Sequence, residues 1–170
     1  MADDRVVDFF VEIPRGSRSK YELDETAGRL RLDRVLHSSV HYPADYGFIP
    51  DTLAPDGDHL DAIVIVEEPG LPGSLQSVRP IGLLDMVDEK GEDQKILAVP
   101  VGDPRFDDVK ALDDLPKHWR LEIETFFQTY KALEGGKGAT VKGWHGADAA
   151  WRAIEKARGA YRPGRQRSPL

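Results

Sequence analysis

The sequence predicts an α+β fold that is mainly β: a closed or nearly closed barrel of strands with two main helices packed outside it. Short apolar segments typical of strands fill the first two thirds of the 170 residues, and the hydrophobic period becomes helical after about residue 113. Strands followed by two helices favour a barrel that carries helices on its surface. A chain of this length is expected to form one domain with a substantial core.

Six segments in the first part have the composition of strands and are separated by turn residues. They are residues 6–13, 20–23, 29–36, 62–66, 78–87 and 95–101. Residues 24–28 are predicted to connect two strands as a hairpin, and residues 88–93 form a polar turn between the last two. In the third segment Leu30, Leu32 and Arg34 alternate with Arg31, Asp33 and Val35, so Arg34 is expected to point inward.

The remaining elements are two helices and a short strand between them. Asp113 or Asp114 can cap the first helix, whose first turn includes Pro116 and whose end is predicted at residues 135–136. One stripe of this helix is apolar and consists of Ile123, Phe126, Phe127 and Tyr130. A strand at residues 139–144 and a helix at about 147–160 follow.

Composition and charge exclude several classes of protein. The 23 basic and 30 acidic residues give a net charge of −7, which argues against a general nucleic-acid binder. The chain has no cysteine, hence no disulfide and no thiolate ligand. The absence of a long apolar stretch and of a signal-like N-terminus predicts a soluble, cytoplasmic protein without a membrane partner. Residues 1–161 are expected to form the domain, and residues 162–170 a basic, flexible tail.

The most informative segment carries three aspartates within six residues, directly before an apolar strand. Asp56, Asp58 and Asp61 repel one another, and a hard divalent cation such as Mg²⁺ would relieve that repulsion because it prefers oxygen ligands. An EF-hand loop is excluded, since its fifth and sixth positions would be Leu60 and Asp61. A solvated polar turn remains the structural alternative to a metal site.

Further charged residues lie at predicted strand ends and in the long helix. Asp88 and Asp93 flank the polar turn, and Lys95 shares the side of Asp93. Each remaining candidate has a structural alternative, such as a surface lysine, a snorkelling arginine or a buried tyrosine. These candidates are Lys20, Glu22, Arg34, Tyr42, Tyr46, Tyr130 and Lys131. Together, carboxylates for divalent cations and cationic or phenolic groups for phosphate oxygens suit a phosphate substrate.

These residues, in this order and spacing, resemble the soluble family I inorganic pyrophosphatases of the bacterial type. The resemblance runs from about Val11 to Glu155 and centres on residues 56–64, Asp-Gly-Asp-His-Leu-Asp-Ala-Ile-Val. It is supported by residues 12–14, 20–22, 33–34, 42–43, 45–47, 88–95, 126–127 and 130–131. The resemblance implies an OB-like barrel, a homohexamer and no catalytic histidine, because Glu25 and Lys90 stand where some relatives carry histidines.

The resemblance also implies hydrolysis of pyrophosphate to two orthophosphates by a metal-activated water. Several Mg²⁺ ions per site are expected, with Mn²⁺ or Zn²⁺ as possible substitutes, and Asp58 is expected to act as the general base. The implied metal ligands are Asp56, Asp61, Asp93, Asp88 and Glu22. The implied phosphate-binding residues are Lys20, Arg34, Tyr46, Lys95, Tyr130 and Lys131. Glu12 and Tyr42 match supporting positions at the edge of the site.

Two alternatives stay open from the residues alone. The first alternative is a metal-dependent hydrolase of another phosphoanhydride or of a phosphodiester. The sequence has no glycine-rich phosphate loop, which argues against a nucleotide substrate. The other is a non-catalytic, OB-like module that binds single-stranded nucleic acid. Such modules pair a basic groove with stacking aromatic residues, whereas aspartates line the site expected here.

Overall fold

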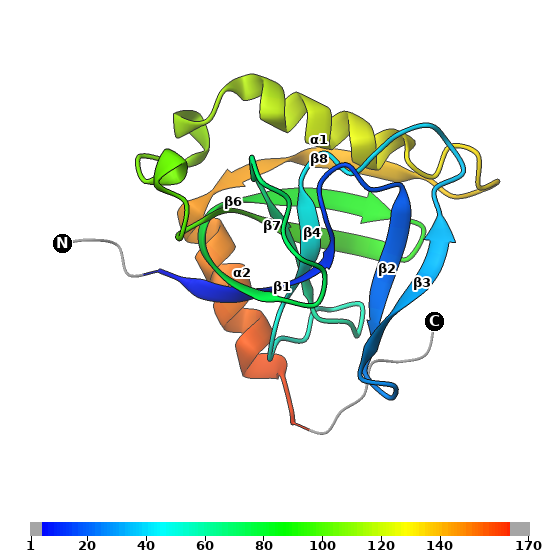
Figure 1. The fold of residues 1–170 in the computed structure, drawn as a ribbon, viewed down its shortest axis with the longest axis horizontal. Helices are drawn as coiled ribbons and strands as arrows, with labels where there is room; N and C mark the ends of the chain where they lie inside the picture. Colours follow the sequence, from blue (N-terminus) through cyan, green and yellow to red (C-terminus); the bar gives the residue numbers. More distant parts are fainter. Residues whose placement is uncertain (1–4, 164–170) are drawn as a thin grey trace.

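A closed ring of five strands forms the centre of the computed structural model, which describes residues 5–163 (Figure 1). The ring runs β1–β4–β5–β7–β6 and closes where β6 pairs with β1. Its strands are β1 (Val7–Ile13), β4 (Asp45–Ile49), β5 (Leu60–Val64), β6 (Leu75–Asp88) and β7 (Gly91–Pro100). All neighbours in the ring are antiparallel except β5 and β7, which are parallel.

Three further strands lie outside this ring. Strand β8 (Ala139–Gly146) pairs with the second half of β6. Strands β2 (Ser19–Asp24) and β3 (Arg29–Val35) pair only with each other among the described strands, and this hairpin stands beside the ring (Figure 1). The hairpin and the ring are therefore separate supports, and the predicted site residues are divided between them.

The 14-residue strand β6 performs two tasks because it changes register in its middle. Its first four residues pair with β1, and its remainder forms the long hairpin with β7. The register shifts between Pro80 and Gly82, where proline lacks the N–H that a regular ladder needs. This irregularity lets one strand both close the ring and carry Asp88 toward the site.

The two helices cover opposite faces of the strands. Helix α1 (Lys117–Thr129) buries Ile123, Phe126 and Phe127 in one apolar cluster, as its apolar stripe predicts. Helix α2 (Ala147–Ala160) buries Ala150, Ile154 and Ala157 in a second cluster, with alternate residues of the same strands. Short 3₁₀ turns lie at Pro104–Phe106 and Leu112–Asp114. The predicted mainly β fold with two main helices is confirmed, and the strand ring corresponds to the predicted barrel.

Both predicted ends of the first helix are wrong. Asp114 closes the preceding 3₁₀ turn by accepting the backbone N–H groups of Lys110 and Ala111, so Pro116 occupies the N-cap position instead. The helix ends at Thr129, several residues before Gly135. Successive turns then follow, with the Glu134 N–H bonded to the Lys131 carbonyl at 2.9 Å.

Three strand predictions also need correction. Strand β4 was not predicted, because its five residues include Gly47 and follow a proline-containing loop. The polar turn at residues 88–93 is shorter than predicted, since β6 ends at Asp88 and β7 begins at Gly91. In β3 the register shifts beside Asp33, so Arg34 is half-buried as expected while Leu32 is 47 % exposed.

Among the described residues, no helix is long and apolar enough to cross a membrane. The predicted tail at 162–170 lies outside the described residues from position 164 onward.

Candidate active site

Three of the predicted aspartates line one pocket at the start of β5. Asp56, Asp61 and Asp93 face it together with His59 and Gln94. The loop before β5 is held by its own backbone, since the Ala54 N–H bonds to the Asp58 carbonyl at 2.7 Å and the Asp58 N–H bonds to Asp56 Oδ1 at 3.0 Å. The parallel pairing of Asp61 with Lys95 then brings β7, and with it Asp93, to the same place.

The electrostatics of this pocket favour a cation. Burial raises the pKa of Asp56, and the neighbouring carboxylates of Asp61, Asp58 and Asp93 raise it further. Burial likewise raises the pKa of Asp93, although the ammonium of Lys95 opposes this rise. A divalent cation would favour the ionised form of each of these carboxylates.

Lys95 is the cationic side chain that pairs with the aspartates of the pocket. It is 2 % exposed, and its Nζ lies 3.3 Å from Asp61 Oδ2 and 3.1 Å from Asp93 Oδ2. It also donates a 2.7 Å hydrogen bond to the Tyr46 hydroxyl, which itself donates to Asp61 Oδ2 at 2.8 Å. Burial lowers the pKa of Lys95, but the carboxylates of Asp93 and Asp61 outweigh burial and raise it above its usual value.

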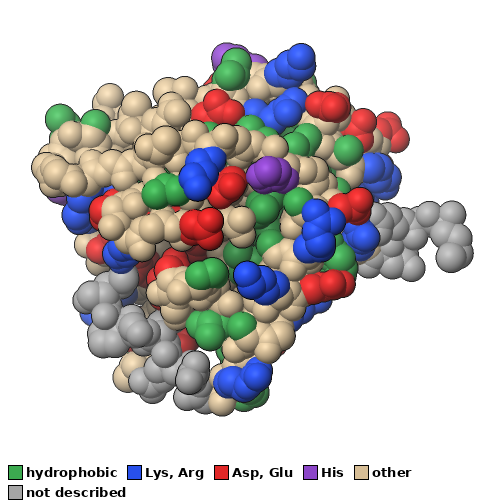
Figure 2. Space-filling view, turned by 180° about the vertical axis from the view of Figure 1, so that it is seen from behind, with side chains coloured by type: hydrophobic (Ala, Val, Ile, Leu, Met, Phe, Trp, Pro, Cys, Tyr) green, Lys and Arg blue, Asp and Glu red, His purple; other side chains and the backbone are tan. Residues whose placement is uncertain are grey.

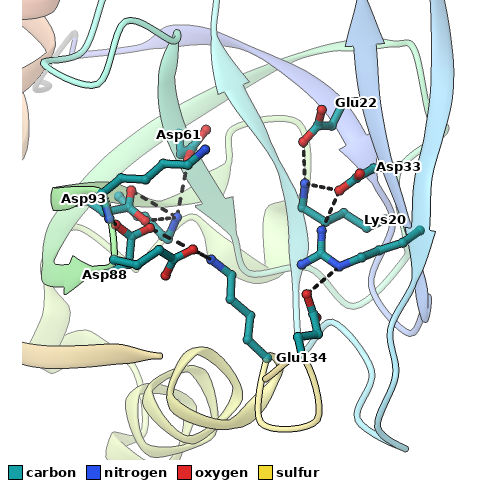
Figure 3. Close-up of polar contacts among 12 residues, drawn as sticks. Lys20, Glu22, Asp33, Asp61, Asp88, Asp93 and Glu134 are labelled. Atoms are coloured by element: carbon teal, nitrogen blue, oxygen red, sulfur yellow. Dashed lines mark hydrogen bonds and ion pairs between the residues drawn. The ribbon is translucent and has the colours of Figure 1, made fainter. Parts of the chain in front are cut away.

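A second charged cluster belongs to the β2–β3 hairpin and faces the first (Figure 3). Lys20 donates to Glu22 and, at 3.1 Å, to Asp33 Oδ2, as expected for residues that share a strand face. Arg34 Nη1 donates to the same Asp33 oxygen at 2.5 Å, and Arg34 Nε lies 3.0 Å from Glu134 Oε1. Figure 3 shows Asp61, Asp88 and Asp93 on the opposite side of the opening from these groups.

The end of helix α1 lies between the two clusters. Tyr130 is 8 % exposed and stacks on Phe126, with 5.2 Å between the ring centroids. Burial lowers the pKa of the adjacent Lys131, but Tyr130 and the Glu89 carboxylate outweigh burial and raise it above its usual value. Lys131 Nζ lies 3.1 Å from Glu89 Oε1 and 4.0 Å from Asp88 Oδ2, which connects the helix end to the β6–β7 hairpin.

The two residues predicted to support the site, Glu12 and Tyr42, are both buried. Glu12 is buried and accepts the backbone N–H of Leu23 at 2.7 Å, which fastens the hairpin to β1. Tyr42 is buried against Phe126, and burial followed by the nearby Tyr130 raises its pKa well above the usual value.

The structure also places residues at the site that sequence reasoning did not assign. Asp33 and Glu134 hold Arg34, Glu89 holds Lys131, and His59 contacts Glu25 of the hairpin. Glu134 follows Tyr130 by four residues and precedes two glycines. This spacing is the signal that could have placed the Glu134 carboxylate on the same side of the helix end as Tyr130. No comparable signal marks the pairing of His59 with Glu25, because it depends on how the hairpin folds over the loop.

The donor set fits a divalent cation, since carboxylate oxygens dominate the pocket. Among residues 5–163, no three His, Asp or Glu side chains converge closely enough to form a ready-made metal cluster. Asp61 and Asp93 are paired with Lys95 instead. Carboxylates on one side and phosphate-binding cations on the other are typical of metal-dependent enzymes that act on phosphates.

The comparisons with known proteins narrow this class to one family. Residues 9–162 match the family model described as inorganic pyrophosphatase, so the chain belongs to the inorganic pyrophosphatase family. It is 49 % identical over 161 residues to the inorganic pyrophosphatase of Methanosarcina acetivorans, covering 95 % of each chain. It is also 49 % identical over 158 residues to that of Halalkalibacterium halodurans, covering 93 % of this chain and 96 % of the relative.

A solved structure shows the same fold. The crystal structure of inorganic pyrophosphatase from Thermus thermophilus superposes with a TM-score of 0.91 at 45 % sequence identity. The match covers 95 % of this chain and 94 % of the Thermus chain. The family resemblance seen in the sequence is thereby confirmed.

Proposed function

We propose that the chain hydrolyses inorganic pyrophosphate to two orthophosphates with the help of several Mg²⁺ ions. The observation that carries the proposal is the pocket lined by Asp56, Asp61 and Asp93. In Figure 3, Asp61 and Asp93 lie opposite Lys20, Glu22 and Asp33 of the β2–β3 hairpin. The names of the close relatives support the choice of pyrophosphate.

In the proposed mechanism, Asp58 accepts the proton of the attacking water. Bound divalent cations would supply an acidified water and screen the charge of the leaving phosphate. Asp56, Asp61 and Asp93 would hold the tightest cation, while Asp88 and Glu22 would hold cations that arrive with substrate. Six residues would bind and orient the phosphate oxygens: Lys20, Arg34, Tyr46, Lys95, Tyr130 and Lys131.

The phosphate-binding groups differ in what they can do. Arg34 presents a planar fork to phosphate, whereas Lys20 and Lys131 act as point charges. The Tyr46 hydroxyl accepts from Lys95 and donates to Asp61, so it links the phosphate side of the site to the metal side. It would donate to a phosphate oxygen in place of Asp61 when substrate binds. Burial, followed by the charges of Asp61 and Asp93, raises the pKa of Tyr46 well above its usual value, which keeps the phenol a hydrogen-bond donor.

The remaining features of the proposal concern the whole protein. We propose Mg²⁺ as the physiological metal with Mn²⁺ or Zn²⁺ as substitutes, a homohexamer by family resemblance, and a cytoplasmic location that suits the cysteine-free composition. Residues 1–161 would act as one catalytic domain.

An assay of orthophosphate release tests the function directly. The protein is incubated with pyrophosphate, ATP or a dinucleotide in Mg²⁺, with and without a chelator. We expect rapid release of orthophosphate from pyrophosphate and not from ATP or the dinucleotide. The chelator should abolish this release. Faster release from ATP or from the dinucleotide would instead indicate the phosphoanhydride or phosphodiester hydrolase that the sequence leaves open.

The nucleic-acid module is disfavoured by the charge distribution. Acidic and basic side chains are intermingled on the face shown in Figure 2, without a broad basic surface. The pocket itself is acidic and would repel a polyanion without metal. Salt-sensitive RNA binding in the presence of chelator would support the module and contradict the enzyme.

A further inference from the structure

Glu134 is a nearly buried carboxylate to which neither the sequence nor the proposed mechanism assigns a role. Its side chain is 4 % exposed, and Oε1 lies 3.0 Å from Arg34 Nε. Its second oxygen, Oε2, is buried and has no hydrogen-bond partner among residues 5–163. A buried carboxylate is unfavourable unless it is paired, so Arg34 is the group that makes Glu134 tolerable at this position.

The local backbone explains why this carboxylate reaches the hairpin. Helix α1 ends at Thr129, and a turn bonds the Glu134 N–H to the Lys131 carbonyl. Gly135 and Gly136 follow with φ values of 37° and 72°, a conformation that favours glycine and reverses the chain toward β8. Glu134 is therefore fixed on the same short segment as Lys131, facing β3.

The contact determines which donors of Arg34 remain for a ligand. A guanidinium carries five N–H donors in one plane. Nη1 donates to Asp33 at 2.5 Å, and Nε forms a 3.0 Å ion pair with Glu134 Oε1 that lacks hydrogen-bond geometry. The two carboxylates therefore act on different edges of the guanidinium. Neither contact uses Nη2, so Asp33 and Glu134 leave its two N–H donors for a ligand.

Glu134 also joins two parts of the fold that are otherwise separate. Arg34 belongs to the β2–β3 hairpin, which forms its own sheet, whereas Glu134 belongs to the loop that follows α1. The Arg34–Glu134 ion pair therefore sets the distance between the phosphate-binding groups of the hairpin and Lys131 at the helix end (Figure 3).

We propose that Glu134 is a positioning residue that orients the Arg34 guanidinium for a phosphate group of the substrate. It acts through Arg34 and does not touch the substrate. The inference rests on the proposed function, because it names how one phosphate-binding residue of that site is held. A carboxylate that merely stabilised the loop would affect folding but would not depend on the identity of residue 34.

The test is a double-mutant cycle of Glu134→Gln and Arg34→Lys in the full chain. Glutamine keeps the shape of the glutamate side chain and one acceptor oxygen, but it removes the negative charge that orients the Arg34 guanidinium. We expect Glu134→Gln to raise KM for Mg-pyrophosphate by about 10-fold and to change kcat by less than about 3-fold, as for lost ground-state binding. In the Arg34→Lys background, the same substitution should change KM by less than about 2-fold.

Two further variants and two further measurements keep the outcome clear. Glu134→Asp, which retains the charge, should recover part of the lost affinity, and Glu122→Gln on an exposed face of α1 should have no effect. Calorimetry with imidodiphosphate, a non-hydrolysable analogue, measures binding without turnover, and thermal unfolding checks the fold of every variant. Equal KM and analogue affinity for Glu134→Gln and the unaltered protein would overturn the proposal, as would an equal effect in both residue-34 backgrounds.

The proposed function and the proposed role of Glu134 can be contradicted independently of each other. Absence of orthophosphate release by the unaltered protein would contradict the proposed function. The calorimetric cycle, run with imidodiphosphate and with inorganic phosphate, would then still decide whether Glu134 positions Arg34 for a phosphate group.

Discussion

His59 Nε2 lies 2.5 Å from Glu25 Oε1, so the tip of the β2–β3 hairpin contacts the loop that carries the aspartate cluster. The other ring nitrogen, Nδ1, lies 3.0 Å from the Thr52 carbonyl oxygen. The imidazole is also stacked on Phe48, with 4.4 Å between ring centroids and an interplanar angle of 11°. The ring is thus held on its face and at both nitrogens, and it fixes the loop between Asp58 and Asp61.

Replacing His59 should loosen this loop. His59→Ala removes both polar contacts and the stacking, so we expect a loss of about 2 kcal/mol in the free energy of unfolding. The Mg²⁺ concentration for half-maximal activity should rise several-fold, because the carboxylates on either side lose their fixed spacing. His118→Ala is the control, since the His118 side chain is 75 % exposed. Unchanged unfolding and unchanged Mg²⁺ dependence would remove His59 from this role.

Asp58→Asn tests the proposed general base. The substitution keeps the size of the side chain and removes its ability to take a proton. We expect turnover to fall by about 10²-fold or more while metal binding, measured by calorimetry, is nearly retained. Asp113→Asn, at a 90 % exposed side chain on the surface, provides the control. A variant as active as the parent would show that another group accepts the proton.

Lys95→Met tests whether the buried ammonium acts as an internal counter-ion. Its loss leaves Asp61 and Asp93 without their shared cation, so the metal-free protein should lose about 3 kcal/mol of stability. Mg²⁺ binds the same carboxylates and should stabilise the variant more than it stabilises the parent. Thermal unfolding with and without Mg²⁺ measures both effects. The exposed Lys142→Met is the control, and an equal Mg²⁺ shift in parent and variant would refute the idea.

Gly47→Ala tests how closely β1 and β4 must approach. A Cβ at Gly47 would lie 1.8 Å from the Phe10 carbonyl oxygen, so the two backbones would have to separate. We expect a loss of about 3 kcal/mol in denaturant unfolding. Gly159→Ala, in α2 with no heavy atom within 4 Å of the added group, should instead stabilise by up to about 1 kcal/mol. Similar midpoints for the two variants would contradict this reading of the strand contact.

Local patterns in the sequence were sufficient for most elements of the fold. The apolar stripe of α1 and the limits of α2 follow from helical periodicity, and both agree with the structure. Strand β4 did not follow, because its pairing with β1 and β5 is set by distant residues. The prediction of the helix cap failed for a local reason, because Asp114 accepts the N–H groups of Lys110 and Ala111 in the preceding turn instead.

Some contacts of the candidate site also follow from local sequence patterns, and others depend on tertiary structure. The shared side of Asp93 and Lys95 follows from strand alternation and agrees with the structure, as does the shared face of Lys20 and Glu22. The parallel register that sets Asp61 beside Lys95 depends on tertiary structure. The contacts of Arg34 with Glu134 and of His59 with Glu25 join residues 100 and 34 positions apart, beyond the reach of any local pattern.

The separation of the β2–β3 hairpin from the strand ring has a consequence for engineering and for divergence within the family. The acidic pocket rests on ring strands whose backbones are fixed by pairing on both sides, whereas Lys20, Glu22 and Arg34 rest on a two-stranded arm. Substitutions along the arm are therefore expected to change the proposed phosphate-binding groups without altering the strand pairing that supports the pocket. Any hairpin grafted onto the same ring would have to keep the contacts through which Glu12, His59 and Glu134 hold the present one.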